Sequence, residues 1–388
     1  MNIKELDNTY VAETYARFPV EIVKGEGCIA YDENGKSYID LGSGIAANVF
    51  GYADKVWADA VTAQVNAVQH TSNLYYCAPG ARLAEMLCEK TGMKKVFFAN
   101  SGAEANECAI KTARRWAFKK YGDESHAGII TLINSFHGRT ITTLAATGQD
   151  SFHTEFGPFT PGFYYAPADD ASAVRKLAEE HGCCAVMMET VQGEGGVNPL
   201  SKEFVAEVLE IAKEHDLLII VDEIQTGNGR TGKLYSWMHY GFVPDIMSTA
   251  KGLGGGLPIG ACLMGEKVKD VMTPGSHGST FGGNPVCCAG ALSIIPRLDE
   301  KLMAEVAEKS EYIINELTGA KGVNGVSGMG LMLGIDTVRP AKEVLMGCME
   351  RGVLVLTAKT KVRLLPPLNI PFPQLKQAIA ILKEELEK

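Results

Sequence analysis

LLIIVDEIQTG, at residues 217–227, is the stretch of this sequence that decides the fold. Its first five residues, Leu217 to Val221, form an unbroken apolar run, which is typical of a strand buried on both faces of a parallel sheet. Asp222 and Glu223 follow at the C-terminal end of that strand. Because open α/β sheets bind their ligands at the carboxyl ends of their strands, these two carboxylates are candidates for a functional site.

A second stretch, STAKGLGGG at residues 248–256, places Lys251 between a short apolar run and a glycine-rich loop. A lysine held away from water loses proton affinity and becomes suited to forming a Schiff base. An aspartate that pairs with a ring nitrogen and a lysine that forms an imine are the protein groups that pyridoxal phosphate chemistry requires. Taken alone, Asp222 and Lys251 are equally consistent with a solvated strand-end carboxylate and a loop lysine.

The segment GNGRTGK, at residues 227–233, also matches two nucleotide-binding patterns. The phosphate-loop pattern requires Ser or Thr after its lysine, and this chain has Leu234 there. The dinucleotide pattern requires its first glycine directly after the strand, whereas residues 222–226 intervene. We therefore reject both motifs, which leaves a nucleotide-binding protein as the weaker alternative from another functional class.

The bulk composition narrows the class of protein. The chain has 388 residues and a formal net charge of −9, which argues against nonspecific binding to nucleic acid or to an anionic membrane. No apolar run approaches the length of a transmembrane helix, and the start, MNIKELDNTY, lacks the apolar core of a signal peptide. Ten cysteines without a CxxC pair predict neither a zinc site nor a disulfide framework. We expect a cytoplasmic enzyme with reduced thiols and no metal.

The pattern along the chain predicts an α/β protein. CIAYDENGKSYIDL, at residues 28–41, alternates around Asn34-Gly35 and predicts a β-hairpin. Residues 54–69 predict an amphipathic helix, and from residue 94 short apolar strands alternate with helical stretches. The predicted strands are KVFFAN (95–100), GIITLI (128–133), CAVMME (184–189), LLIIVD (217–222), DIMST (245–249) and GACLMG (260–265).

This alternation indicates a large three-layer α/β domain built on a mostly parallel sheet. Residues from Pro285 to about Leu317 predict a long helical connection, followed by strands and helices typical of a smaller α+β domain. We expect the N-terminal hairpin to complete that smaller domain. The predicted boundaries are an N-terminal arm and hairpin at residues 1–53, a large cofactor-binding domain at 54–284 and a C-terminal small domain at 285–388.

A phosphate-binding position is predicted at Ser101-Gly102-Ala103-Glu104, directly after the strand 95–100. The spacing of Ser101 and Glu104 is that of a capping box, so a helix is expected to begin there. The first N–H groups of a helix have no partner within it, and the helix dipole is positive at that end, which favours a phosphate. Gly102 and Ala103 are small enough to let an anion reach the backbone. A capping box alone also fits a purely structural helix start.

Four further segments carry side chains that suit a flat, anionic ligand. FHGRT, at residues 136–140, offers Phe136 for stacking and Arg139 for a bidentate grip on a carboxylate. Each segment alone also fits an ordinary loop or strand, but their clustering at predicted strand ends indicates one site. The other candidate side chains are Glu189 and Glu194 in METVQGEGGV (188–197), Ser279 and Thr280 in GSTFGGNP (278–285), and Arg363 in KVRLLPPL (361–368).

Taken in order, these segments resemble the class III aminotransferases of pyridoxal-phosphate fold type I, most of all the branch that acts on acetylornithine. The similarity extends from YARFPVEIVKGEG (15–27) to VRLLPPL (362–368). It implies pyridoxal 5'-phosphate as cofactor, acylated ornithine and 2-oxoglutarate/glutamate as small-molecule substrates in arginine biosynthesis, and a homodimer with shared active sites. The motifs are NSGAEANE (100–107), FHGRT (136–140), QGEGG (192–196), VDEIQTGNGRTG (221–232), KGLGGGLPIG (251–260) and GSTFGGNP (278–285).

The resemblance assigns residues to the cofactor ring by position. It implies that Lys251 forms the Schiff base and transfers the proton, and that Asp222 pairs with the pyridinium nitrogen. Gln225 would contact the ring hydroxyl, and Phe136 would stack on the ring.

The resemblance also assigns residues to the cofactor phosphate. Gly102 and Ala103 would bind it through their N–H groups. Thr280 would be contributed to it by the second subunit of the dimer.

For the substrates, the resemblance implies that Arg139 holds the α-carboxylate of the amino donor, with Ser279 and Tyr15 assisting. Glu194 and Arg363 look like the family's switch pair, which lets one pocket accept two different substrates.

One position bears on the amino donor. In an ungapped alignment Ile45 stands where ornithine enzymes typically carry a tyrosine, which favours a donor with an acylated α-amine over free ornithine. This position does not separate acetyl from succinyl. Succinylornithine, ornithine and 4-aminobutyrate aminotransferases of the same class remain the alternatives.

Overall fold

The computed structural model describes all 388 residues, and its centre is a seven-stranded sheet. Six of the seven strands run parallel to one another, and only β12 is antiparallel to its two neighbours. The strand predicted at residues 217–222 lies in the middle of this sheet and is buried along its whole length. In spatial order the strands are β4 (Lys95–Ala99), β12 (Gly260–Met264), β11 (Ile246–Thr249), β10 (Leu218–Asp222), β7 (Cys183–Met188), β5 (Gly128–Leu132) and β6 (Phe163–Ala166).

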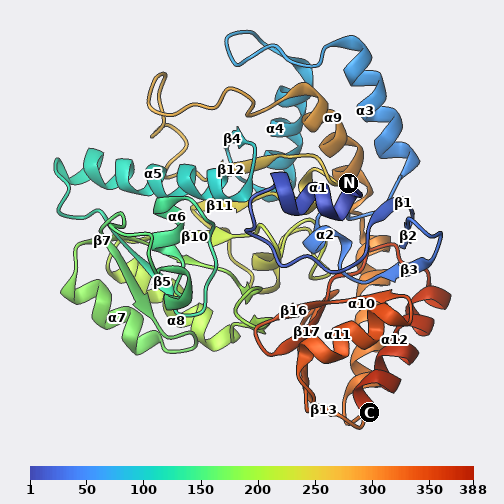
Figure 1. The fold of residues 1–388 in the computed structure, drawn as a ribbon. Helices are drawn as coiled ribbons and strands as arrows, with labels where there is room; N and C mark the ends of the chain where they lie inside the picture. The colour runs from blue at the N-terminus through green and yellow to red at the C-terminus, as the bar shows by residue number, and fades with distance from the viewer.

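Helices cover both faces of the large sheet, as the three-layer prediction requires. In Figure 1, α5 (Gly102–Tyr121) lies on one side of the sheet, and α7 (Ala171–Glu180) and α8 (Lys202–Glu214) lie on the other. Further helices flank this layered part: α3 (Lys55–Ala67), α4 (Ala78–Thr91), α6 (Ile141–Ala146) and α9 (Pro285–Ile294).

Two four-stranded sheets build the remainder of the molecule. In the first, the predicted N-terminal hairpin pairs with a strand from the C-terminal part, so the two ends of the chain share one sheet. Figure 1 shows this N-terminal segment beside the C-terminal helices. The first sheet contains β1 (Ile22–Glu26), β2 (Ile29–Asp32), β3 (Ser37–Asp40) and β15 (Val353–Leu354); the second contains β13 (Val323–Met329), β14 (Met332–Thr337), β17 (Lys361–Leu364) and β16 (Leu356–Ala358). The helices here are α10 (Glu300–Leu317), α11 (Ala341–Glu350) and α12 (Phe372–Glu387).

The helical connection predicted from Pro285 to about Leu317 is present, but it is interrupted. The chain forms two α-helices, α9 and α10, with a short 3-10 turn between them. Pro296 has no N–H to continue the helix, and Asp299 starts the second helix by accepting a hydrogen bond from the Leu302 N–H. The elements that the sequence pattern did not predict include β6 and the two-residue strands β8 (Val191–Gln192) and β9 (Asn198–Pro199).

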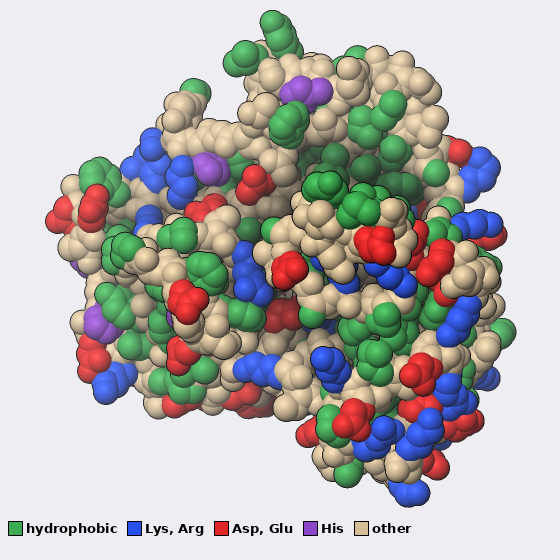
Figure 2. All heavy atoms as spheres, viewed as in Figure 1, with side chains coloured by type: hydrophobic (Ala, Val, Ile, Leu, Met, Phe, Trp, Pro, Cys, Tyr) green, Lys and Arg blue, Asp and Glu red, His purple; other side chains and the backbone are tan.

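The loop between α3 and α4 exposes large apolar side chains. Leu74, Tyr75 and Tyr76 all project into solvent, and hydrophobic side chains stand out at this end of the molecule in Figure 2. Phe281, in the loop that carries Ser279 and Thr280, is also exposed. None of the helices is both long and apolar enough to cross a membrane.

Candidate active site

A cavity of about 450 Å³ opens at the carboxyl edge of the large sheet. The loops that follow β4, β5, β7, β10 and β11 all contribute to its wall, so the parallel strands bring together segments that are far apart in the sequence. Eight of the candidate residues from the sequence line this cavity: Gly102, Ala103, Phe136, Arg139, Glu189, Asp222, Gln225 and Lys251.

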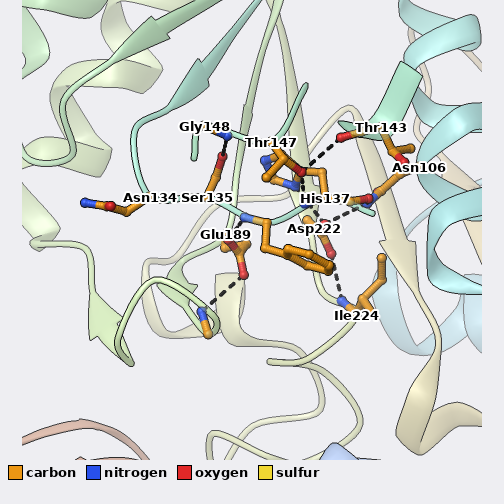
Figure 3. A network of polar contacts seen from close by, with 12 residues as sticks. Asn106, Asn134, Ser135, His137, Thr143, Thr147, Gly148, Glu189, Asp222 and Ile224 are labelled. Atoms are coloured by element: carbon orange, nitrogen blue, oxygen red, sulfur yellow. Dashed lines mark hydrogen bonds and ion pairs between the residues drawn. The ribbon is translucent and has the colours of Figure 1, made fainter. Parts of the chain in front are cut away.

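Asp222 is the last residue of β10, and three donors fix its buried carboxylate (Figure 3). Its Oδ2 accepts hydrogen bonds from His137 Nδ1 at 2.8 Å and from Asn106 Nδ2 at 2.7 Å. Its Oδ1 accepts one from the N–H of Ile224 at 3.0 Å. The carboxylate therefore has a single orientation, toward the cavity, and is shielded from water on its other sides.

Glu223 has a different role from its neighbour. Its carboxylate accepts hydrogen bonds from the side chains of Ser236 and Thr226 and from the N–H of Trp237, all outside the cavity. Successive residues at a strand end point to opposite faces of the sheet, so only Asp222 of the two faces the site. Glu223 is thus a structural carboxylate.

Glu189 stands at the end of β7, one strand away from Asp222. Its carboxylate accepts the N–H of Phe136 at 2.9 Å and the N–H of Gly193 at 3.2 Å, so it joins two loops of the cavity wall. Burial raises the pKa of Glu189 to about 7, and the neighbouring negative charge of Asp222 adds to the rise while His137 opposes it. No role had been assigned to Glu189 from the sequence.

Lys251 follows β11 and lines the cavity with its side chain. Burial lowers the pKa of its amine to about 8, although the negative charge of Glu194 opposes the shift. The residue has a positive φ of 46°, a backbone conformation that costs energy for a non-glycine residue and is concentrated at functional sites. This lysine can therefore lose its proton near neutral pH, as a nucleophilic amine must.

The start of α5 forms another part of the cavity wall. Ser101 caps the helix by accepting the N–H of Glu104 at 3.2 Å, which confirms half of the predicted capping box. The other half is displaced by one residue, because the Glu104 carboxylate accepts the N–H of Asn100 at 2.6 Å. A Cβ on Gly102 would come within 2.7 Å of the Ile224 side chain, so only glycine allows this close approach. The first N–H groups of the helix are thereby presented at the cavity.

Arg139 and Phe136 lie together at the cavity wall. The guanidinium carbon of Arg139 lies 4.1 Å from the centre of the Phe152 ring and 5.5 Å from that of Phe136. Arg139 is exposed and its contacts are with aromatic rings, so its charge is available to a carboxylate from solution.

Glu194 and Arg363 form an ion pair, as the sequence predicted. Arg363 Nη1 donates to Glu194 Oε1 at 2.6 Å and to Gln225 Oε1 at 3.0 Å. Burial alone would raise the pKa of Glu194, but the charge and hydrogen bond of Arg363 outweigh it and hold that pKa below its ordinary value. The Gln225 amide also donates to Glu194 at 3.3 Å, so all three side chains form one cluster.

Five predicted site residues do not line the cavity. Glu194 and Arg363 contact its wall through Gln225, and Tyr15, Ser279 and Thr280 lie on other segments. Tyr15 is 75% exposed on the N-terminal arm. The Ser279 hydroxyl accepts hydrogen bonds from Asn100 Nδ2 and from the N–H of Gly282, and Thr280 lies exposed on the same loop. The proposed roles of Tyr15, Ser279 and Thr280 therefore depend on a second subunit or on movement of these segments.

Asn106 is a further residue of the site that the sequence pattern did not predict. Its side-chain amide donates to Asp222 and, at 2.7 Å, to the carbonyl of His137, so it ties the strand end to the loop after β5. A signal was present, because a polar residue at i+4 from Gly102 lies on the same face of the helix as the helix start. The sequence pattern also did not predict the contact of His137, in the FHGRT segment, with Asp222.

A comparison with known families matches residues 10–386 to the family described as Aminotransferase class-III. The chain is a class III aminotransferase. A protein of Haemophilus ducreyi described as acetylornithine aminotransferase is 47% identical over 388 residues, covering 100% of this chain and 98% of that protein. An Aquifex aeolicus protein of the same description is 44% identical over 380 residues, covering 97% of this chain and 100% of that protein.

Solved structures place the aminotransferase in pyridoxal-phosphate fold type I. The ornithine aminotransferase of Toxoplasma gondii superposes with a TM-score of 0.95 at 32% identity, covering 99% of this chain and 94% of that chain. The N-acetylornithine aminotransferase of Stenotrophomonas maltophilia superposes with a TM-score of 0.85 at 33% identity, covering 98% and 97%. The predicted fold class, cofactor and reaction type are thereby confirmed.

The cavity of the aminotransferase fits pyridoxal 5'-phosphate. A buried carboxylate, a lysine with a lowered pKa and an open helix start line one wall, and they match a ring nitrogen, an aldehyde and a phosphate. The Nε2 atom of His137 is buried without a hydrogen-bond partner, so the contact of Nδ1 with Asp222 is the one hydrogen bond of this imidazole ring. When bound, the cofactor supplies an aldehyde for the amino group and a ring that delocalises the electron pair left by proton removal.

Proposed function

We propose that this aminotransferase transfers the δ-amino group of N2-acetyl-L-ornithine to 2-oxoglutarate, which yields the semialdehyde and glutamate. The Glu194–Arg363 pair carries the proposal, because it places a covered cation against Gln225, in the wall of the cavity that the uncovered cation Arg139 also lines. An enzyme that alternates between a substrate with one carboxylate and a substrate with two requires such an arrangement. The names of the relatives support acetylornithine as the donor.

In this proposal the residues around the cofactor act on protons and charge. The amine of Lys251 removes the proton from the carbon next to the reacting nitrogen, since its lowered pKa makes a neutral amine accessible. Asp222 would hold a proton on the ring nitrogen, and His137 and Asn106 fix the orientation of its carboxylate. Phe136 would face the ring, Gln225 its hydroxyl group, and Gly102 and Ala103 its phosphate.

The substrates would be held by the two arginines. Arg139 would bind the single carboxylate of acetylornithine, with Ser279 and Tyr15 assisting. Arg363 would bind the α-carboxylate of glutamate or 2-oxoglutarate once Glu194 has moved away.

Ornithine aminotransferase is the rival that has an observation in its favour, namely the TM-score of 0.95 to the Toxoplasma gondii enzyme. Ile45 argues for the acylated donor, because an apolar side chain suits an acylated α-amine better than a free ammonium group. The test is a panel of amino donors with 2-oxoglutarate, containing acetylornithine, succinylornithine, ornithine and 4-aminobutyrate and ranked by kcat/KM. A higher kcat/KM for any other donor than for acetylornithine would overturn the proposal.

We also propose a homodimer in the cytoplasm, with Thr280 reaching the cofactor phosphate of the second subunit. The exposed apolar side chains Leu74, Tyr75, Tyr76 and Phe281 support this assembly, since Phe281 directly follows Thr280 in the chain. The proposed domains are residues 1–53 and 285–388 for the small domain and 54–284 for the large domain. Light scattering at micromolar concentration tests the assembly, and a monomeric mass would contradict it.

A further inference from the structure

Arg230 is a fully buried cation for which the proposed mechanism has no use. It lies in GNGRTG, the segment that the nucleotide-binding patterns had singled out. No carboxylate pairs with it; its Nη1 instead donates to the backbone carbonyls of Leu331, at 3.1 Å, and Pro366. Its Nη2 is buried without a partner, and burial lowers the pKa of Arg230 to about 9. Burying a charge without a carboxylate partner costs desolvation free energy, so the position of Arg230 requires a specific explanation.

The two carbonyls mark the end of a strand pair. β14 and β17 are antiparallel, with Leu333 opposite Leu364, so two steps further along the ladder Leu331 comes opposite Pro366. Pro366 has no N–H, and the ladder cannot continue at that point. Nη1 of Arg230 lies between the two carbonyls and supplies the hydrogen bonds that the ladder lacks.

The backbone of the Arg230 segment also contacts the same strand pair. The carbonyl of Arg230 accepts the N–H of Leu331 at 2.9 Å. A Cβ on Gly330 would come within 2.5 Å of the Thr231 backbone, and one on Gly229 within 2.8 Å of the Leu368 side chain. The segment is therefore seated directly on the end of β17 and on the chain that follows it.

The same strand carries Arg363, three residues before Pro366. Arg363 donates to Gln225, which belongs to the loop that continues to Arg230. The loop after β10 thus contacts β17 at two points, one at the guanidinium of Arg363 and one at the strand end. The contact at the strand end does not involve Glu194, so it would remain if Glu194 moved away.

We propose that Arg230 is a positioning residue for Arg363, which it holds in register with the cofactor loop while Glu194 is displaced. The inference rests on the proposed function, in which Arg363 binds the α-carboxylate of 2-oxoglutarate and glutamate. Loss of the strand-end contact lets β17 shift, and a bidentate grip on a carboxylate tolerates little shift. The acetylornithine half-reaction uses Arg139, which lies on a different loop and is unaffected.

A purely structural role for Arg230 makes a different prediction. It would lower thermal stability and reduce both half-reactions to the same extent. Lys309 offers a matched control, because it is also a buried cation that donates to a backbone carbonyl of this region, that of Leu368 at 2.9 Å. Lys309 forms no hydrogen bond or ion pair with the loop after β10 and pairs with Glu305 instead, at 3.4 Å. Lys309→Met therefore reports the loss of a buried cation that does not hold that loop.

The experiment compares the holoenzymes of wild type, Arg230→Met, Arg230→Lys and Lys309→Met in single-turnover measurements of each half-reaction, alongside thermal unfolding. In Arg230→Met we expect the apparent Kd for 2-oxoglutarate to rise about tenfold, while the acetylornithine half-reaction stays within about twofold of wild type. Arg230→Lys should recover part of the 2-oxoglutarate affinity, because an ammonium can still donate to one carbonyl. Lys309→Met should keep the wild-type ratio of the two half-reactions whatever its melting temperature.

Equal losses in both half-reactions of Arg230→Met, with wild-type turnover intact, would overturn the inference and leave the proposed function standing. If Arg230→Met does not fold, Arg230→Lys decides the question by the same ratio. A wild-type enzyme that does not use 2-oxoglutarate would overturn the proposed function and this inference with it.

Discussion

His137 and Asp222 form a buried pair at the end of the central strand, with 2.8 Å between Nδ1 and Oδ2. Because Asn106 donates to the same carboxylate oxygen, the carboxylate cannot turn away from the cavity. The charge of Asp222 is thus directed at one point in the cavity, the place proposed for the ring nitrogen.

Asp222→Asn should slow proton removal far more than it weakens substrate binding, because a neutral amide does not hold a proton on the ring nitrogen. We expect kcat to fall on the order of a hundredfold or more with little change in KM. Glu223→Gln is the control, since Glu223 faces Ser236 and Trp237 outside the cavity. A wild-type kcat in Asp222→Asn would remove Asp222 from the mechanism.

Lys251→Ala should lose the visible absorbance of the covalently attached cofactor and nearly all turnover. The reason is that no other lysine lines the cavity. Borohydride reduction of the wild-type holoenzyme followed by peptide mapping provides the direct measurement. Labelling of any lysine other than Lys251 would show the assignment to be wrong.

The lowered pKa of Lys251 gives the cofactor-free protein a characteristic pH dependence. Only the neutral amine attacks an aldehyde, so the rate of cofactor capture should rise with pH through about 8 and then level off. The same shift affects the free energy of unfolding. Between a pH of about 8 and the unfolded-state pKa of about 10.4, Lys251 is protonated in the unfolded chain and neutral in the folded one. Because the unfolded chain then binds more protons, the stability of the folded protein rises with pH in that window. Stopped-flow capture rates measure the first effect. A rate that still climbs steeply above pH 10 would contradict the buried, neutral amine.

Much of the fold could be predicted from the sequence because its strongest signals are local. The apolar run ending at Val221 indicated a central strand, and the hairpin around Asn34-Gly35 followed from turn chemistry. The break at Pro296 was missed because the surrounding apolar residues continue a helical period across it. Local sequence patterns therefore predict whether a segment is a helix or a strand more reliably than they predict where a helix is interrupted.

The site was predictable to the extent that strand ends determine it. Parallel strands place their carboxyl ends at one edge, so Asp222 and Lys251 could be grouped without a structure. The contacts of Asn106 and Arg230 could not be predicted from the positions of strand ends. Both depend on pairings across more than 100 residues of sequence, Asn106 with Asp222 and Arg230 with Leu331 and Pro366, which periodicity does not encode.

The acyl group of the amino donor should matter, and we expect Ile45 to be a residue that distinguishes donors with and without it. Ile45 lies in α2 (Ser43–Ala46), a left-handed turn in which Ile45 has φ 58° and ψ 56°, two residues before Ala47 in the cavity wall. A β-branched residue in this conformation is strained by about 1–2 kcal/mol, so the turn is held by its surroundings. We expect a higher kcat/KM for acetylornithine than for ornithine in the wild type, and a smaller ratio in Ile45→Tyr. Equal values for the two donors would move the enzyme to the ornithine branch.

In the proposed reaction one cavity accepts two different substrates in turn. Acetylornithine reacts at the end far from its only carboxylate, which Arg139 would hold. Glutamate reacts at its α-amine, so its α-carboxylate lies beside the reacting carbon and requires a second cation, for which Arg363 is the candidate. During the first half-reaction an uncovered Arg363 would attract the wrong carboxylate, and Glu194 covers it with 2.6 Å between Oε1 and Nη1.

Glu194→Ala should therefore lower discrimination between the substrates. The acetylornithine kcat/KM should fall about tenfold or more, because the buried charge of Arg363 is left without its partner and competes for the donor's carboxylate. The glutamate half-reaction should be retained or improved, since its α-carboxylate no longer has to displace Glu194. Glu194→Gln provides the matched control, because it keeps a hydrogen bond to Arg363 without the charge and should give an intermediate result. Single-turnover measurement of each half-reaction decides the matter: equal losses in both would mean that Glu194 supports the cavity in general and does not act as a switch.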